Sequence, residues 1–465
     1  MGLALPKNDA NNMRETIVIG LGETGFSVAR HLSKQNIAFT MMDTRLDPPE
    51  LSMFKNTYPD TDVYLEKEAV EKLNNLSGAA QLIVSPGVDI NQDIFQKTVT
   101  ENDSECIGDI EIFARCTNKP IVAITGSNGK STVTSLLAEM ARTAKVKAYA
   151  GGNLGPPALD LLDCDDAELF VLELSSFQLE STKSLQPEVS AVLNVSADHL
   201  DRHGDVDNYA NIKEQIYSKA KFSVVNREDN YVSKMHYSGE VIRFGLTQPA
   251  IGEFGVIEDS TEAFLAFGEQ RLLPVSELAL QGESGILNSL AALAMGYVIK
   301  LPMQVMLAEL KNFKGLPHRL ALVSRQKGIA WFNDSKGTNI GATISSLRSL
   351  NNEKSNESKN SQKIILIAGG IFKGGDLALL KDEVSKHAKH VILLGQDAPL
   401  MQQGLEGAAP ISIVRSMSHA VEEAQHIAAN GDQVLLSPAC ASFDMYKNYI
   451  ERGCDFENCV RGLAS

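Results

Sequence analysis

The chain has 465 residues, of which 43% are apolar, and carries a formal charge of −15 at pH 7. One hydrophobic core seldom extends over so long a chain, so we expect two or three domains of α/β type. An acidic surface repels nucleic acid and anionic membranes, because neither would release counterions on binding to it. A small anionic ligand is not excluded, since helix N-termini and local basic residues can hold phosphate.

The sequence contains neither a membrane-spanning segment nor the cysteine spacing of a zinc-binding motif. Residues 1–15 are polar, and the longest apolar stretch, 290–299, covers only about half a membrane span before Lys300. The six cysteines are scattered without zinc-binding spacing, so we expect reduced and mostly buried thiols. We therefore expect a cytoplasmic protein with no membrane insertion and no nucleic-acid partner.

Short β-branched runs alternate with amphipathic helical stretches, which is typical of parallel sheets with crossover helices. We place three domains at residues 1–107, 108–315 and 316–465, and we expect the polar segment 351–361 to be a solvated loop. A β-rich stretch is predicted at 241–274. The other predicted strands are 16–19, 38–42, 81–84, 121–124, 169–172, 191–194, 222–225, 329–332, 364–368, 391–394, 411–414 and 433–436.

A glycine-rich loop follows the predicted strand 121–124 and precedes a predicted helix at 133–144. Glycines let backbone N–H groups turn toward a phosphate, Lys130 adds positive charge near the β- and γ-oxygens, and the Ser131 hydroxyl can ligate Mg²⁺. The helix directs its positive end at the anion. The sequence therefore predicts an ATP site formed by Gly126, Ser127, Asn128, Gly129, Lys130, Ser131 and Thr132.

A second glycine turn, Gly20-x-Gly22-x-x-Gly25, matches the dinucleotide fingerprint, with Asp43 at the end of the next strand. On its own this pattern suggests NAD and an oxidoreductase. The pattern reports only a phosphate-bearing ligand at a helix N-terminus, so any nucleotide diphosphate is an alternative. A tight turn that serves packing alone is another.

Polar residues collect where predicted strands end. Glu173 leaves a buried strand beside the ATP loop, which suits a metal ligand, and His199 follows the next strand. By residue type alone, Lys213 would be a solvated lysine on a helix surface. Polar turns at 333–339, 369–374 and 437–444 favour a composite ligand site, although each turn alone could be a helix cap.

Together these motifs resemble the Mur ligases, the ATP-dependent amino-acid ligases of peptidoglycan assembly. The stretches 333–339 and 437–444 resemble the branch of the family that adds D-glutamate, and those that resemble its shared ATPase core are 125–132, 151–155, 173–178, 194–202 and 315–319. The resemblance implies a Rossmann-like UDP-binding domain, a central P-loop ATPase with a parallel sheet and a small β-rich part, and a Rossmann-like C-terminal domain. It implies UDP-N-acetylmuramoyl-L-alanine and D-glutamate as substrates, and we expect a monomer.

The resemblance also implies roles for individual residues. The UDP-linked substrate would contact Gly22, Thr24, Thr44, Arg45, Ser85, Pro86, Gly87, Asn153 and His199. Asn288, Arg319 and Asp334 would complete the ATP site, and D-glutamate would contact Thr338, Lys373, Ser442, Phe443 and Tyr449. One Mg²⁺ would be held by Ser131 and Glu173, and a second by Glu173, His199 and a carbamylated Lys213. Catalysis would depend on Lys130, His199, Lys213 and Arg319.

The implied reaction transfers the γ-phosphoryl group of ATP to the L-alanine carboxylate, after which the amine of D-glutamate displaces phosphate. His199 is one candidate base for that amine, although metal ligation would compete with this role. Three alternatives are weighed: a folate polyglutamate ligase or sister Mur enzyme, an NAD-dependent oxidoreductase, and an ATP-gated interaction protein without catalysis.

Overall fold

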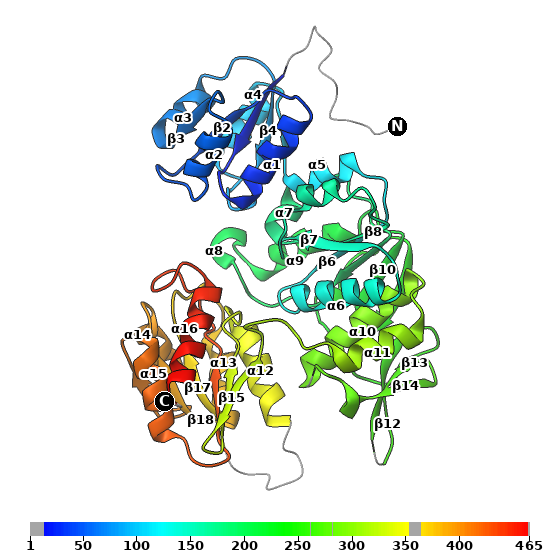
Figure 1. The fold of residues 1–465 in the computed structure, drawn as a ribbon, viewed down its shortest axis with the longest axis vertical. Helices are drawn as coiled ribbons and strands as arrows, with labels where there is room; N and C mark the ends of the chain where they lie inside the picture. The colour runs from blue at the N-terminus through cyan, green and yellow to red at the C-terminus, as the bar shows by residue number, and fades with distance from the viewer. Residues whose placement is uncertain (1–13, 261, 281, 353–363, 464–465) are drawn as a thin grey trace.

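The computed structural model describes residues 14–260, 262–280, 282–352 and 364–463, which form three β-sheets (Figure 1). The N-terminal sheet lies at one end of the molecule, and the C-terminal sheet lies at the other end, against the central domain. Each sheet is mostly parallel, as the alternation of strand and helix patterns predicts.

The N-terminal sheet has five parallel strands in the order β3-β2-β1-β4-β5. The chain order reverses between β1 and β4, so a ligand crevice opens at the carboxyl ends of these two strands. The elements are β1 (Glu15–Ile19), α1 (Glu23–Lys34), β2 (Thr40–Asp43), α2 (Leu51–Thr57), β3 (Val63–Leu65), α3 (Glu66–Asn74), β4 (Ala80–Val84), α4 (Asp93–Glu101) and β5 (Glu105–Ile107).

The central sheet has nine strands in the order β14-β13-β12-β11-β10-β9-β6-β8-β7, and only the β12-β13-β14 part is antiparallel. Its strands are β6 (Ile121–Thr125), β7 (Ala148–Gly152), β8 (Leu169–Glu173), β9 (Val189–Val192), β10 (Phe222–Asn226), β11 (Glu240–Phe244), β12 (Phe254–Glu258), β13 (Ala263–Phe267) and β14 (Gln270–Pro274). Its α-helices are α5 (Asp109–Cys116), α6 (Lys130–Thr143), α7 (Ser176–Glu180), α8 (Leu200–His203), α9 (Val206–Glu214), α10 (Gly282–Val298) and α11 (Met303–Asn312). Short 3₁₀ segments are η1 (Ala158–Asp163), η2 (Gln215–Tyr217), η3 (Val232–Lys234) and η4 (Val275–Glu277).

Strand β6 is buried on both faces, which is why it reads as a continuous apolar run. Val122 and Ile124 pack into the core under α6 and α10, whereas Ile121 and Ala123 point into a core that continues into the N-terminal domain. Successive side chains of a strand point to opposite faces of the sheet. The strand is therefore fixed from both sides, and the loop that follows it emerges at a defined place.

The C-terminal sheet has six strands in the order β15-β16-β20-β17-β18-β19, with only the edge strand β15 antiparallel. Gly315, with φ of +73°, lies in the connection from the central domain. The elements are β15 (Ala321–Gln326), β16 (Ile329–Asn333), α12 (Ile340–Asn352), β17 (Ile364–Ala368), α13 (Leu377–His387), β18 (Ala388–Leu393), α14 (Ala398–Gly404), β19 (Ile411–Ile413), α15 (Met417–Ile427), β20 (Gln433–Leu436) and α16 (Tyr449–Gly462).

Several sequence expectations are corrected by the structure. Strands β3, β5, β7 and β15 were not predicted, and β9 lies two residues earlier than expected. Helix α12 extends to Asn352, so the first two residues of the predicted loop 351–361 are helical, and the rest of that loop lies outside the described residues. Only Cys440 among the six cysteines is buried, so mostly buried thiols were a wrong expectation. None of the helices in the described ranges is long and apolar enough to cross a membrane.

Candidate active site

The glycine-rich loop joins β6 to α6, which starts at Lys130, three residues before the predicted start. Gly126 and Gly129 have φ of +151° and +84°, a region that side chains of L-residues rarely allow. A Cβ atom on Gly129 would lie 2.5 Å from Oδ1 of Asn288 on α10. The loop is thus shaped by its glycines, and Asn288, which the resemblance to the Mur ligases assigns to ATP, lies directly against it.

Lys130 folds back over this loop. Its Nζ donates to the carbonyl oxygens of Gly126 at 2.7 Å and Ser127 at 3.1 Å, and burial lowers its pKa. The neighbouring hydroxyl, Ser131 Oγ, accepts a hydrogen bond of 2.7 Å from Nη2 of Arg319. Arg319 lies just before β15 of the C-terminal sheet. Lys130 of the central domain and Arg319 of the C-terminal domain therefore both lie at the glycine-rich loop.

Glu173 ends β8 beside this loop and is almost completely buried. Its Oε1 accepts a hydrogen bond of 2.6 Å from Asn153 Nδ2, and Oε2 has no hydrogen-bond partner among the described residues. A buried carboxylate oxygen without a donor normally has a cation or a water as its partner. Residues 14–260, 262–280, 282–352 and 364–463 contain no cluster of three His, Cys, Asp or Glu side chains fit to hold a metal ion. A cation at Glu173 would therefore need further ligands such as a hydroxyl, a phosphate or a modified lysine.

Lys213 lies on α9 with only 1% of its surface exposed, so the expectation from residue type alone was wrong. Its Nζ donates to Gly126 O at 3.1 Å and to Thr125 Oγ1 at 3.3 Å, and it lies 4.4 Å from the centroid of the Tyr209 ring. Burial lowers the pKa of Lys213 well below its ordinary value. The packing of α9 against α7 turns this lysine toward the loop, and average residue preferences carry no information about such docking.

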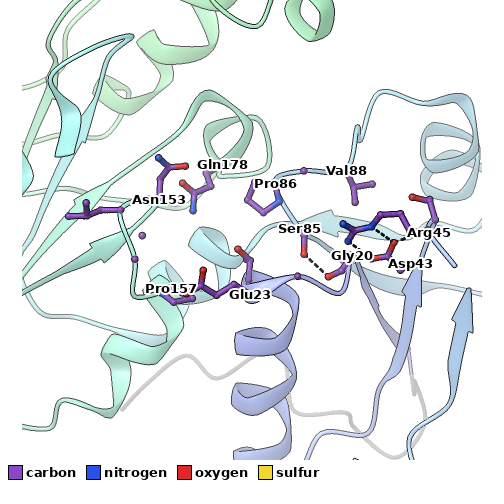
Figure 2. Close-up of a pocket in the computed structure, with 17 residues that line it drawn as sticks. Gly20, Glu23, Asp43, Arg45, Ser85, Pro86, Val88, Asn153, Pro157 and Gln178 are labelled. Atoms are coloured by element: carbon purple, nitrogen blue, oxygen red, sulfur yellow. Dashed lines mark hydrogen bonds and ion pairs between the residues drawn. The ribbon is translucent and has the colours of Figure 1, made fainter. Parts of the chain in front are cut away.

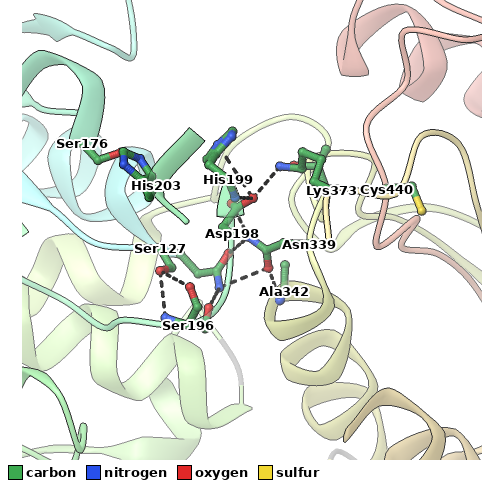
Figure 3. Close-up of polar contacts among 12 residues, drawn as sticks. Ser127, Ser176, Ser196, Asp198, His199, His203, Asn339, Ala342, Lys373 and Cys440 are labelled. Carbon is green, nitrogen blue, oxygen red and sulfur yellow. Dashed lines mark hydrogen bonds and ion pairs between the residues drawn. The ribbon is translucent and has the colours of Figure 1, made fainter. Parts of the chain in front are cut away.

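Asp198 joins the central and C-terminal domains, although it was not among the predicted site residues (Figure 3). Its Oδ1 accepts a hydrogen bond of 2.7 Å from Lys373 Nζ, and its Oδ2 accepts one of 2.9 Å from Asn339 Nδ2. Asn339 Nδ2 also donates to Oδ1 of Asn128 in the phosphate loop at 3.3 Å. Both missed residues lie within motifs that the sequence singled out, 194–202 and 333–339.

His199 directly precedes α8 and has a left-handed backbone with φ of +54°. Its Nε2 lies 3.7 Å from Oδ1 of Asp198, and its ring makes an edge contact with Phe177, with 5.0 Å between centroids. Burial lowers the pKa of His199 to about 4. The imidazole is therefore neutral near pH 7, the form that binds a metal ion or accepts a proton.

Asp334 lies at the end of β16 and is enclosed by hydroxyl groups. Its Oδ2 accepts hydrogen bonds of 2.7 Å from Ser346 Oγ and from Ser437 Oγ, and its Oδ1 accepts one of 3.3 Å from the Leu320 amide. Burial raises the pKa of Asp334 to about 6. Since Leu320 follows Arg319 in the chain, these contacts help to fix the segment that carries the arginine to the loop.

The residues assigned to D-glutamate fall into separate groups. Thr338 Oγ1 accepts a hydrogen bond of 3.4 Å from Lys373 Nζ, which brings these two together. The centroid of the Tyr449 ring lies 4.0 Å from Nζ of Lys336, a lysine that was not among the predicted site residues. Burial lowers the pKa of Lys336 to about 8. On the loop after β20, Ser442 is buried and Phe443 is 71% exposed.

A cavity of about 550 Å³ opens between the N-terminal and central domains (Figure 2). It is lined by the predicted residues Gly22, Thr24, Thr44, Arg45, Ser85, Pro86, Gly87 and Asn153, whereas His199 is not part of its lining. Gln178 and Val88 also line it, and neither was predicted.

Arg45 is held at the cavity by Asp43. The Arg45 Nε and Nη2 atoms donate to the Asp43 carboxylate at 2.9 Å and 2.8 Å. Burial would raise the pKa of Asp43, but hydrogen bonds from Arg45 and Leu21 hold it below its ordinary value. The guanidinium is thereby oriented before any ligand arrives.

The fold and the site define a three-domain P-loop enzyme in which the C-terminal domain contributes residues at the phosphate loop. Residues 14–108 match the family profile described as the Mur ligase MurD-like N-terminal domain, residues 124–296 match the Mur ligase middle domain, and residues 318–440 match the Mur ligase glutamate ligase domain. The chain belongs to the Mur ligase family.

Similar proteins include the UDP-N-acetylmuramoylalanine–D-glutamate ligases of Pseudomonas syringae pv. tomato and Legionella pneumophila. They are 43% and 42% identical over 452 residues, covering 97% and 96% of this chain and 98% and 99% of their own lengths. Among solved structures, UDP-N-acetylmuramate-alanine ligase MurC from Thermotoga maritima has a TM-score of 0.61 at 16% identity, covering 97% of this chain and 100% of its own. MurF from Acinetobacter baumannii has a TM-score of 0.58 at 16% identity, covering 83% and 92%. At these identities the solved structures bear on the fold alone, and they confirm the predicted α/β class.

Proposed function

We propose that the chain is an ATP-dependent ligase that joins D-glutamate to UDP-N-acetylmuramoyl-L-alanine in the synthesis of peptidoglycan precursors, yielding ADP and phosphate. One contact carries the proposal best. Asn153 lines the interdomain cavity and also donates to Glu173 beside the phosphate loop. A UDP-linked substrate in the cavity would therefore have its reacting end next to the γ-phosphate of ATP on the loop. The cavity volume is in the range of small-molecule sites.

The first step activates a carboxylate, which is a poor acyl donor because oxide is a poor leaving group. A carboxylate oxygen of L-alanine attacks the γ-phosphorus of ATP, the bond from that phosphorus to the ADP oxygen breaks, and an acyl phosphate forms. Lys130 and Arg319 would disperse the charge of the transferring group, which is the main source of catalysis in phosphoryl transfer.

In the second step the amine of D-glutamate attacks the acyl carbon, loses a proton, and phosphate leaves. We propose that Thr338, Lys373, Ser442, Phe443 and Tyr449 hold the amino acid. The neutral imidazole of His199 is one candidate acceptor for the proton, in competition with metal ligation.

The residues near Glu173 fit divalent cations. Ser131 and Glu173 would hold one Mg²⁺, and Glu173, His199 and a carbamylated Lys213 a second, which together would neutralise charge on the phosphoryl oxygens. Oε2 of Glu173, which finds no hydrogen-bond partner in the described part of the chain, supports this assignment.

Lys213 is buried and forms no ion pair with the described residues, and its hydrogen-bond partners are uncharged. Both observations support its carbamylation. Its neutral amine would add to the carbon of CO₂, form an N–C bond and release one proton. The product is an anion in place of a cation, and an anion favours a metal ion nearby.

We also propose domain boundaries near residues 107 and 315, a monomeric enzyme, and a cytoplasmic location, since ATP and UDP-linked precursors are cytoplasmic compounds. Gly315, with φ of +73° in the connection between the central and C-terminal sheets, supports the second boundary.

The proposed activity is tested by ATP turnover that depends on both acceptors. We expect ADP release to require UDP-N-acetylmuramoyl-L-alanine and D-glutamate together, and to stop when either is omitted. Turnover with L-glutamate on a folate, or binding of a nicotinamide nucleotide in the interdomain cavity, would contradict the proposal in favour of one of its alternatives.

Replacing Arg45 tests the assignment of the cavity. We expect Arg45→Met to raise KM for the UDP-linked substrate by about tenfold or more with kcat nearly unchanged, because a contact remote from the reacting atoms supplies uniform binding. Initial rates at varied substrate concentration measure this. Arg14→Met, a surface change in the same domain, is the matched control, and an equal effect there would refute the assignment.

A further inference from the structure

Arg202 lies where three segments of two domains meet. On α8, it donates from Nη2 to Oε2 of Glu180 at 2.5 Å. Its Nε lies 3.1 Å from Oδ1 of Asp89 in the N-terminal domain, which is an ion pair without a hydrogen bond to Nε. The side chains of Arg202 and Glu180 are only 12% and 7% exposed. A buried bridge of this kind has a much larger effect when one partner is removed than an exposed ion pair has.

The two carboxylates that hold Arg202 belong to segments that line the interdomain cavity. Asp89 follows Val88, and Glu180 lies two residues after Gln178, and both Val88 and Gln178 line the cavity (Figure 2). A substrate that seats against Val88 and Gln178 therefore contacts the two segments that carry these carboxylates, and Arg202 Nη2 also donates to the Val88 carbonyl oxygen at 3.5 Å.

Arg202 is also connected to His199, through the Phe177 ring that both side chains contact. The guanidinium carbon lies 5.2 Å from the centroid of the Phe177 ring, and the His199 ring packs edge-on against Phe177. The Arg202 amide also donates to the His199 carbonyl at 3.1 Å. Phe177 thus has contacts with both the guanidinium and the imidazole.

The helix that carries Arg202 needs external support, because α8 has four residues and a helix of one turn is unstable on its own. His203 at its end supplies part of that support, because its Nε2 lies 3.0 Å from Ser176 Oγ (Figure 3). Its Nδ1 lies 3.4 Å from Glu180 Oε1 without a hydrogen bond. The left-handed backbone of His199 is a further constraint that the surroundings must maintain.

We propose that Arg202 is a positioning residue that couples the seating of the UDP-linked substrate in the interdomain cavity to the placement of His199. The inference rests on the proposed function of the chain. When the substrate holds the Val88–Asp89 segment in place, Arg202 keeps α8 and the Phe177 ring fixed, and His199 faces the reacting carboxylate.

A second bridge between the same two domains provides a matched control. Arg30 Nη2 lies 2.6 Å from Oδ2 of Asp160, and Ser27 Oγ donates to Oδ1 of the same carboxylate at 2.7 Å. This bridge joins α1 to η1, and within the described part of the chain no hydrogen bond, ion pair or ring contact links it to α8 or to His199.

The test compares steady-state kinetics of Arg202→Met, Asp89→Asn, their double variant and Arg30→Met in the full chain, with thermal unfolding of each. We expect Arg202→Met to lower kcat about 30-fold and to raise KM for UDP-N-acetylmuramoyl-L-alanine about tenfold, with KM for ATP changed by less than about twofold. Asp89→Asn, which leaves Glu180 paired, should change kcat and KM in the same direction by less, and should add nothing in the double variant. Arg30→Met should keep near-normal kinetics even if its unfolding midpoint falls.

The inference is overturned if Arg30→Met reproduces the kinetic profile of Arg202→Met, if the effects of Arg202→Met and Asp89→Asn are additive, or if Arg202→Met leaves kcat and KM unchanged. An inactive wild-type chain would instead contradict the proposed function. In that event the ¹H–¹³C NMR signal of the His199 Cε1–H group, assigned with His199→Gln, still decides: it should move in Arg202→Met and stay in Arg30→Met, and the reverse result refutes the inference.

Discussion

Lys130→Ala should abolish formation of the acyl phosphate while the fold remains intact. Lys130 Nζ donates to the carbonyl oxygens of Gly126 and Ser127. When ATP is bound, the same amine would donate to its phosphates instead. Loss of one such charge at the transferring group should lower kcat by about 10³-fold or more. Trapping of the intermediate with hydroxylamine, together with thermal unfolding, measures both halves of the expectation.

Lys119→Ala is the control for this variant, because Lys119 is exposed and precedes β6 in the same domain. Its rate and unfolding midpoint should match those of the unchanged chain. Near-normal activity of Lys130→Ala would refute the assignment of the phosphate loop.

Lys213→Ala should lose activity by about 10³-fold, as expected when a preorganised charge is removed from a phosphoryl-transfer site, and should regain part of it with millimolar acetate or formate. The substitution leaves room beside Thr125 and Gly126, where a small carboxylate can supply the oxygen atoms of the proposed carbamate. Initial rates with increasing acid concentration provide the measurement.

Lys130→Ala is the control for rescue, since the acid offers nothing that replaces a cation. Rescue of both variants would indicate a non-specific effect of the acid. Full activity of Lys213→Ala without added acid would contradict the carbamate.

The parts of the fold that the sequence predicts are those with strong local signals. β6 and β17 are short apolar runs bounded in the sequence by polar residues, and both strands are buried along their whole length, as a continuous apolar run predicts. β7 was missed because its sequence, Ala-Tyr-Ala-Gly-Gly, has a weak intrinsic strand preference, and only its pairing with β8 makes it a strand. The edge strand β15 was missed for a related reason, since half-buried polar residues interrupt its pattern.

Some residues of the candidate site have a local sequence signal, and others are brought together only by the packing of the domains. The glycine-rich loop 126–132 is continuous in sequence, so its residues could be identified by pattern, whereas Thr44, Arg45, Ser85, Pro86 and Gly87 were assigned to the cavity only through the resemblance to the Mur ligases. Asp198 and Asn339 meet only because the C-terminal domain lies against the central domain, and a contact across 141 positions leaves no local signal. Lys213 was predicted to be exposed from its residue type, but the packing of α9 against the central domain buries it, and no local sequence pattern reports such packing.

The proposed function requires that the L-alanine carboxylate is activated as an acyl phosphate at the glycine-rich loop. Isotope transfer tests this most directly, with UDP-N-acetylmuramoyl-L-alanine labelled with ¹⁸O in both carboxyl oxygens. We predict that each turnover with ATP and D-glutamate delivers one labelled oxygen to inorganic phosphate and leaves the other in the new amide. Phosphate without label, or label found in AMP, would contradict the account.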